Sequence, residues 1–188
     1  MQKALFVKPA KRHKLSPVAW LTALAMMLTI STTLSSPLHW RPSGLSLTIT
    51  FPAIPYTKEV QSQEGGFVNV ASVDKGTYAV KVSFEKLEIG SSIPAELIDT
   101  LKEVISEQSV RDGVTDLQTS VEDVPLGRRV TVRGTKTMKV AEEAHRVLVI
   151  RDGYALPEGI LIVTSTTMVD TPDQACMDFR RAIADLSP

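Results

Sequence analysis

Hydrophobic and polar residues alternate in short runs along the chain beyond residue 44, and each run predicts a strand with one buried face. The clearest run, 78–84 (YAVKVSF), follows a shorter one at 67–73 and the turn Asp74-Lys75-Gly76. Two alternating runs around a glycine-containing turn predict a β-hairpin. Further strands are expected at 45–51, 115–122, 127–136, 144–151 and 159–167.

The run Ile160-Leu161-Ile162-Val163 differs from the others because it is apolar at every position. A strand that is buried on one face alternates, whereas a continuous apolar run is typical of a strand covered on both faces. We therefore expect structural layers on both sides of the sheet.

Apolar residues spaced three and four apart predict two helices. The first spans about 94–109, with Ser92 as its cap and Pro94 in its first turn, where a missing N–H costs nothing. Its apolar stripe consists of Leu97, Leu101, Val104 and Ile105, with Ile98 at the margin. The second helix follows the capping box Thr171-Pro172-Asp173-Gln174. Its apolar face consists of Cys176, Phe179, Ile183 and Leu186.

The predicted elements follow the order β-β-β-α-β-β-β-β-α. This order is typical of an α+β domain in which two helices pack on a largely antiparallel sheet as an α/β/α sandwich. The alternative is a helix-grip or other α+β fold whose sheet encloses a ligand cavity.

Over about residues 45–187 the chain resembles the PsbP/Mog1-like α/β/α sandwich family. The resemblance rests on an opening strand that runs into FPAIP (51–55), the hairpin into 78–84, the central helix, PLGRRVTVRG (125–134) and the closing helix MDFRRAI (177–183). It implies a role in binding or assembly, because the family includes photosystem accessory proteins, a nuclear-transport partner and exported proteins of unknown role. No functional residue of the family can be matched to a position of this sequence.

The first 36 residues have the order of an export segment. A basic run at 8–14 (KPAKRHK) precedes an apolar segment at 18–34, which ends in small residues. Residues 1–36 are therefore predicted to be a cytoplasmic basic tail plus a signal-anchor or signal-peptide helix. Residues 37–44 are expected to form a linker, and residues 45–188 an exported domain.

The apolar segment at 18–34 is either retained in the membrane or removed. Retention as a single-pass anchor is favoured, because Trp20 and Trp40 are spaced to mark the two interfaces of a bilayer. The alternative is cleavage near Ser35, which would release a secreted or periplasmic protein. In both cases the basic residues before the segment keep the N-terminus in the cytoplasm, so the domain is extracytoplasmic.

Composition narrows the choice of partners. Of the 188 residues 21 are basic and 21 acidic, but five of the basic ones precede the apolar segment and the first acidic residue is Glu59. The exported domain is therefore mildly acidic, which argues against nucleic acid as a partner. Cys176 is the only cysteine of the sequence, so the chain forms no internal disulfide, and we expect the thiol in the core.

A possible site for an anionic partner lies in the stretch 127–141, which contains no acidic residue. Its basic residues are Arg128, Arg129, Arg133, Lys136 and Lys139. On a strand, Arg129 and Arg133 share the face opposite Val130 and Val132, where they would meet anionic lipid headgroups or an acidic protein. The simpler interpretation is a solvated strand face that discourages edge pairing.

Carboxylates cluster after the first helix, at Asp112, Asp116, Glu122 and Asp123. In addition, Glu143 and His145 share a strand face. Neither set has the spacing of a zinc or calcium site, and the sequence contains no nucleophile elbow. We therefore expect no metal, no cofactor and no enzymatic activity, and interpret these residues as ordinary turn and surface charge.

The sequence thus favours a membrane-tethered, non-catalytic domain of the cell envelope that binds a protein partner or a ligand. Two alternatives stay open. One is a carrier of small ligands or lipid with an internal cavity, which a filled core would contradict. The other is a carboxylate-dependent hydrolase, which would need two or more acids converging in one cleft.

Overall fold

Seven antiparallel strands form the central sheet of the computed structural model, which describes residues 38–61, 67–90, 92–140 and 143–187. In order across the sheet, the strands are β3 (Tyr56–Gln61), β4 (Phe67–Asp74), β5 (Tyr78–Lys86), β9 (Gly159–Met168), β8 (Glu143–Leu156), β7 (Gly127–Val140) and β6 (Thr115–Val124). A separate pair consists of β1 (His39–Trp40) and β2 (Ile49–Thr50). The described helices are α2 (Ala95–Arg111) and α3 (Gln174–Ala184).

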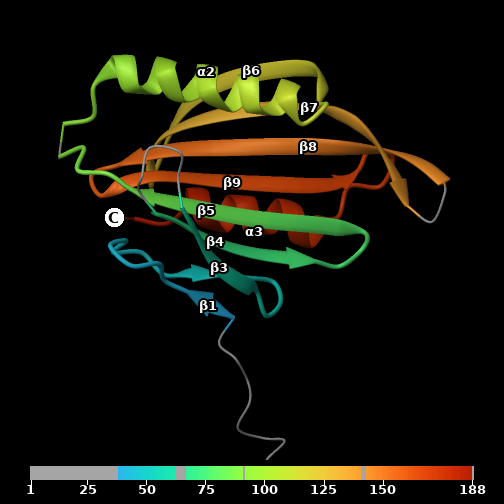
Figure 1. Ribbon diagram of the computed structural model, residues 1–188, viewed down its shortest axis with the longest axis horizontal. Helices are drawn as coiled ribbons and strands as arrows, with labels where there is room; N and C mark the ends of the chain where they lie inside the picture. The colour runs from blue at the N-terminus through green and yellow to red at the C-terminus, as the bar shows by residue number, and fades with distance from the viewer. Residues whose placement is uncertain (1–37, 62–66, 91, 141–142, 188) are drawn as a thin grey trace, which may run out of the picture. The chain divides into compact units, whose positions relative to one another are not determined.

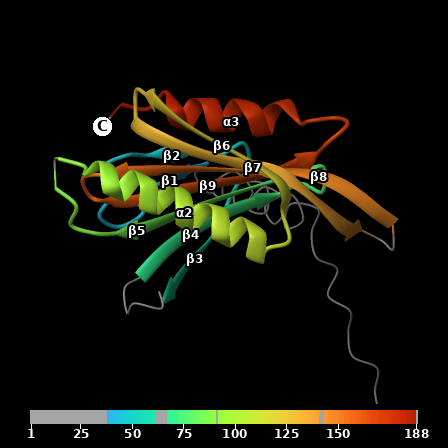
Figure 2. The same ribbon diagram turned by 90° about the horizontal axis from the view of Figure 1, so that it is seen from above.

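The sheet is the middle of three layers (Figures 1 and 2). The helix α3 and the β1–β2 pair cover one face, and α2 lies on the other. Along β9, Leu161 and Val163 join the cluster under α3, whereas Ile160 and Ile162 contact the cluster under α2. The prediction that this apolar run is covered on both faces is confirmed. So is the α+β class, in which two helices pack on a mostly antiparallel sheet.

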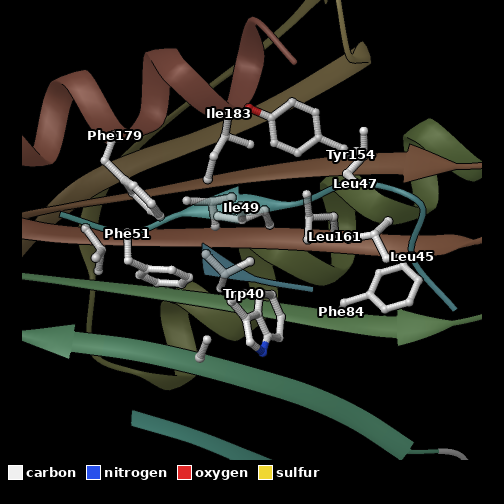
Figure 3. Close-up of a cluster of buried hydrophobic side chains, with 14 of the residues drawn as sticks. Trp40, Leu45, Leu47, Ile49, Phe51, Phe84, Tyr154, Leu161, Phe179 and Ile183 are labelled. Atoms are coloured by element: carbon white, nitrogen blue, oxygen red, sulfur yellow. The ribbon is translucent and has the colours of Figure 1, made fainter. Parts of the chain in front are cut away.

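The larger core lies between the sheet and α3 (Figure 3). The rings of Trp40 and Phe51 meet edge to face with centroids 6.2 Å apart, and the centroid of Phe51 lies 5.0 Å from that of Phe179 on α3. Phe84 and Tyr154, both fully buried, extend into the same space from the sheet. Large side chains therefore fill the region between these two layers.

Trp40 belongs to this core, which differs from what its segment predicts. A linker is expected at 37–44, but β1 pairs there with β2, and Trp40 is only 9% exposed. A side chain buried in the domain cannot also lie at a membrane interface, so Trp40 does not mark the edge of a bilayer.

In the part of the chain that the structure describes, no helix is long and apolar enough to cross a membrane. The predicted apolar segment at 18–34 lies outside that part. The hypothesis of a membrane anchor therefore rests on the apolar segment and the basic run before it, without the spacing of Trp20 and Trp40.

The predicted hairpin is present as β4 and β5, with Val73 opposite Val80 and Ala71 opposite Val82. In the run 45–51 alternate residues are buried as expected, but only Ile49–Thr50 pairs with another strand. The sequence predicts no strand where β3 lies. Every side chain of β3 is exposed, so this strand has no apolar alternation and is held by its backbone pairing with β4.

The helix α2 packs on the sheet through Ile98, Leu101 and Ile105. Ile98 is thus central to the apolar face rather than marginal, and Val104, expected in the stripe, is 48% exposed. Successive residues turn by about 100°, so a face centred on 98, 101 and 105 leaves position 104 on the flank. The predicted cap is also wrong, because the N-cap is Pro94 and no side chain caps the helix.

The helix α3 has the predicted apolar face but a different start. Its N-cap is Asp173, whose carboxylate accepts a hydrogen bond of 2.9 Å from the amide of Ala175. Thr171 and Pro172 therefore lie before the helix, and the predicted cap at Thr171 is wrong. As expected, Cys176 is fully buried and forms no disulfide.

Candidate functional site

A groove of about 500 Å³ lies beside α3, over the half of the sheet formed by β6, β7 and β8. We call it the α3 groove. Its lining residues come from three elements of the sheet and from α3: Gln118, Thr119, Ser120, Glu122, Thr131, Arg133, Leu148, Ile150, Met177 and Arg180. The groove is open on one side and polar, with two arginines and several hydroxyl groups among these residues.

A buried ionic network forms the base of the α3 groove. Asp152 on β8 is fully buried, and its carboxylate accepts hydrogen bonds of 2.7 and 2.8 Å from the guanidinium group of Arg180 on α3. The hydroxyl of Thr131 on β7 donates a further hydrogen bond of 2.7 Å to the same carboxylate. A buried charge is tolerated only when it is paired and hydrogen-bonded, and Asp152 meets both conditions. The network therefore holds α3 at one position beside the groove.

Next to this network, Arg129 on β7 contacts Glu122 on β6. Its guanidinium group donates two hydrogen bonds, of 2.7 and 3.2 Å, to one carboxylate oxygen of Glu122. Burial opposes the charge of this guanidinium group, but the bond to Glu122 and the charge of Asp152 outweigh it and raise the pKa of Arg129. Glu122 and Arg129 therefore neutralise each other.

Tyr154 lies on β8, opposite Arg129 in the neighbouring strand. Burial, together with the nearby charge of Asp152, raises the pKa of Tyr154 to about 12. Its hydroxyl finds no hydrogen-bond partner within the described ranges. At neutral pH this phenol is therefore protonated and does not serve as a base.

Arg133 is the cation of the α3 groove that has no acidic neighbour. Its guanidinium group donates two hydrogen bonds, of 2.8 and 2.5 Å, to the side-chain oxygen of Gln118. Among the residues that the structure places, no carboxylate lies within 4.0 Å of it. An amide oxygen is neutral, so Gln118 orients Arg133 without cancelling its charge. The exposed side of this guanidinium group can donate hydrogen bonds to a carboxylate or a phosphate.

The structure separates the five basic residues that the sequence groups together. Arg129 and Arg133 share the face toward α3, as predicted, because Val130 and Val132 between them are buried under α2. Residues 128 and 136 are on the α2 side of the same strand, by the alternation of side chains. Lys139 is exposed near the far end of β7. Of the five, only Arg133 therefore lines the groove, and Arg129 lies beside it through its contact with Glu122.

The clustered carboxylates are also separated, and each contacts a different arginine. Asp112 pairs with Arg151, Asp116 with Arg146, Glu122 with Arg129, and Asp123 with Arg128. The Nε2 atom of His145 lies 3.8 Å from the Oε2 atom of Glu143. Across residues 38–187, apart from the short stretches left undescribed, no three His, Cys, Asp or Glu side chains are arranged to hold a metal ion. These acids do not converge on one another.

Sequence reasoning missed Asp152, Arg180 and Gln118. The predicted strand at 144–151 stops one residue before Asp152, whereas β8 continues to Leu156. The signal that was available is the position of Asp152 between the apolar runs 147–150 and 154–156, because a buried carboxylate requires a partner. The partner itself, Arg180, is nearly thirty positions away and lies on a separate helix.

Comparison of the chain with protein-family models, with curated proteins and with solved structures finds no match. The resemblance to the PsbP/Mog1-like family therefore rests on the order and burial of the elements and stays a prediction.

Proposed function

We propose that this chain is a membrane-tethered, non-catalytic domain of the cell envelope that binds an anionic group of a protein partner or ligand in the α3 groove. The observation that carries the proposal is Arg133, a cation held in place by the neutral side chain of Gln118. The other charged groups of the lining are matched, since Arg180 pairs with Asp152, and Glu122 pairs with the neighbouring Arg129. The groove therefore has one unmatched positive charge, which favours an anionic occupant.

The packing of the core supports surface binding over transport of a ligand inside the domain. Phe51, Phe84 and Tyr154 are fully buried between the sheet and α3, where a carrier would hold its cargo. The filled core therefore argues against the alternative of a carrier, which would need these side chains to move apart.

The pairing of the acids supports a binding role over hydrolysis. Hydrolysis by two carboxylates needs one of them protonated and one ionised, with both facing the substrate. At the α3 groove Glu122 and Asp152 each accept two hydrogen bonds from an arginine. Each of these two acids is therefore held by its own arginine instead of being free to act on a substrate.

Binding can be tested by NMR titration of the full chain in detergent with sodium phosphate, and separately with a glutamate-rich peptide, at constant ionic strength. We expect saturable shifts of the backbone amides of Ser120 and Arg133. The variant Arg133→Gln should weaken binding by at least about tenfold, because a hydrogen bond to a charged group contributes about 1.5–3 kcal/mol.

The matched control is Arg128→Gln, which removes a charge from the same strand where the guanidinium group contacts Asp123 at 3.6 Å. This variant should bind as the unmodified protein does. If the shifts are absent, or if Arg133→Gln binds as tightly as the control, the proposed site is wrong.

The tether is tested separately by extracting membranes of the producing cells with alkaline carbonate. A chain anchored through residues 18–34 stays in the membrane and keeps its N-terminal mass. A soluble product that begins near residue 36 would contradict the anchor and leave the proposal for the α3 groove to its own test.

A further inference from the structure

On the face of the sheet that carries α2, this helix packs mainly on β7 and β8. Figure 1 looks onto this face, and β9, β5 and β4 are seen with no helix in front of them. Among the described elements, α3 and the β1–β2 pair cover the opposite face of these strands. On this side no described helix lies over β4 and β5, whereas Ile160 and Ile162 of β9 reach the cluster under α2.

We call this surface the open half-face and define it by its most accessible side chains and those beside α2: Tyr56, Lys58, Val60, Lys81, Val104 and Ile162. The strand register brings the residues from the sheet together. Lys58 is opposite Val70, Val70 opposite Ser83, and Ser83 opposite Ile162, so one row crosses four strands. Tyr56 and Lys81 are joined in the next row through Ser72.

The open half-face exposes large apolar side chains. On β3, Tyr56 is 69% exposed and Val60 is 42% exposed, and on the flank of α2, Val104 is 48% exposed. Between this flank and the sheet lies a groove of about 370 Å³, which has Val104 at its wall and Ile162 and Lys81 at its floor. Val104 and Ile162 meet at this groove, whereas Tyr56 and Val60 lie on β3, three strands away from β9. Apolar groups gathered at a groove are typical of an interaction surface, whereas single exposed ones are not.

The charge at the centre of this surface is positive. Lys58 and Lys81 are exposed, and no carboxylate of the described chain lies within 4.0 Å of either amine. The acidic residues Glu85 and Asp74 on the same face lie one row outside Lys58 and Lys81, respectively, near the ends of β5 and β4. Asp112, which lines the groove, is paired with Arg151. An occupant that places acidic side chains over the middle of this face is therefore favoured.

The dimensions of the surface fit one helix. Neighbouring strands are about 4.8 Å apart, so β3, β4 and β5 together span about 14 Å. A helix with its side chains is about 10–12 Å wide, and helices pack beside one another at about 8–10 Å. A helix lying next to α2 would therefore cover these strands and complete the outer layer.

We propose that the open half-face docks an amphipathic helix of a partner protein. The apolar stripe of this helix packs against Val104, Ile162 and Val60. Its acidic flank lies over Lys58 and Lys81. This surface is on the opposite side of the sheet from the α3 groove, so the inference does not depend on Arg133.

Self-association through β3 fits the sequence less well. A symmetric antiparallel pairing centred on this strand places Lys58 opposite Lys58 or Glu59 opposite Glu59, since residues that face each other must be on the same side of the sheet. Like charges in such positions destabilise the pair. A second copy of the chain is therefore an outcome that the experiment has to separate from a partner helix.

The test is photo-crosslinking with benzoylphenylalanine placed at Val104 of the full chain, in the membranes of the cells that produce it. The matched control carries the same group at Val110, which is 62% exposed on the same helix but away from the open half-face. We expect Val104 to yield a product at least about tenfold above Val110. Mass spectrometry should map it to a segment with apolar residues three and four apart and an acidic flank.

Charge reversal tests the role of the lysines. Lys81→Glu, and independently Lys58→Glu, should reduce the Val104 product about tenfold, because like charges then meet across the interface. Lys102→Glu, an equal reversal elsewhere on α2, should leave it unchanged. Two lysine positions are used so that a folding defect in one variant, seen by circular dichroism, does not decide the result.

Several outcomes would overturn the proposal. They are a Val104 product no stronger than that of Val110, a product made only with a second copy of this chain or with lipid, a mapped segment without acidic residues, and lysine variants that crosslink as well as Lys102→Glu.

Discussion

The guanidinium group of Arg180 on α3 forms two hydrogen bonds, of 2.7 and 2.8 Å, with the fully buried carboxylate of Asp152 on β8. Thr131 on β7 adds a third bond to the same carboxylate. One ion pair thus joins a helix to two strands. Because a buried charge without a partner is costly, this contact restricts where α3 can lie on the sheet.

Removing the partner of Asp152 should destabilise the domain strongly. Arg180→Leu leaves an uncompensated buried carboxylate, and we expect a loss of about 3–5 kcal/mol in the free energy of unfolding, measured by urea denaturation. Arg181→Leu is the control, since Arg181 is exposed and its pair with Asp178 at 3.4 Å is on the surface. It should change stability by less than about 1 kcal/mol. The double variant Arg180→Met, Asp152→Leu should recover most of the loss, and equal costs for Arg180→Leu and Arg181→Leu would refute this role.

The contact between Asp112 at the end of α2 and Arg151 on β8 should make stability depend on pH. Burial by itself raises the pKa of Asp112, but the hydrogen bond and charge of Arg151 outweigh it, so the pKa of Asp112 is lower than its ordinary value of 3.8. A carboxylate whose pKa is lower in the folded than in the unfolded state stabilises the fold fully at pH values above its ordinary pKa. This stabilisation is lost as the pH falls through the pKa of the folded state.

Urea midpoints measured between about pH 5 and pH 2 test this. The unmodified protein should lose stability over this range more steeply than Asp112→Asn, which has no carboxylate to protonate. Asp112→Asn should also be less stable at pH 7, by about 1–2 kcal/mol, because Arg151 loses its charged partner and keeps only neutral ones, an amide oxygen and the hydroxyl of Ser109 at 3.1 Å. The figure is modest because Asp112 is partly exposed. Parallel pH curves for the two proteins would contradict the prediction.

Two glycines of the sheet should respond differently to the same substitution. A Cβ atom at Gly134 on β7 would collide with the backbone carbonyl of Thr115 on β6, whereas one at Gly153 on β8 would meet the side chains of Ile105 and Leu101. Side chains can turn aside and a paired backbone cannot. We expect Gly134→Ala to cost about 1–3 kcal/mol and Gly153→Ala to cost less, as measured by thermal unfolding. The reverse order would show that the edge strand β6 moves more readily than α2.

Cys176 should be unreactive while the domain is folded. Burial of the thiol raises the pKa of Cys176, so little thiolate forms, and reagents cannot reach the side chain. With a disulfide reagent at pH 8 we expect the folded protein to react on the order of a thousandfold more slowly than the protein in urea, because reaction requires opening. Labelling of the folded protein at the rate of a free thiol would mean that α3 detaches from the sheet easily.

Much of the fold follows from local patterns. The hairpin β4–β5, the two-sided burial of Ile160–Val163 and both helices were predictable, because each has a hydrophobic period that matches its own geometry. The strand β3 was not, since an exposed edge strand needs no apolar alternation. The rotation of α2, which exposes Val104 and buries Ile98, depends on where the helix contacts the sheet rather than on its own sequence.

The candidate site was predictable only in part. The period of two along a strand is enough to place Arg129 and Arg133 on one face. It says nothing about Gln118 on β6, which contacts Arg133, or about Asp152 on β8, which contacts Thr131. It also cannot tell that Glu122 neutralises Arg129 while Arg133 keeps its charge.

The sequence by itself determined both described helices, most strands of the sheet, the two covered faces of β9 and the acidic character of the domain. These depend on the order and period of residue types. Only the tertiary structure decided the strand order β3-β4-β5-β9-β8-β7-β6 and, with it, which charges meet. Pairings such as that of Asp152 with Arg180 join segments far apart in the chain, and many alternative arrangements satisfy the same local patterns. The arrangement that forms is the one in which each buried charge has a partner and the apolar faces of the sheet and helices pack against each other. This condition applies to the assembled layers and not to any one segment.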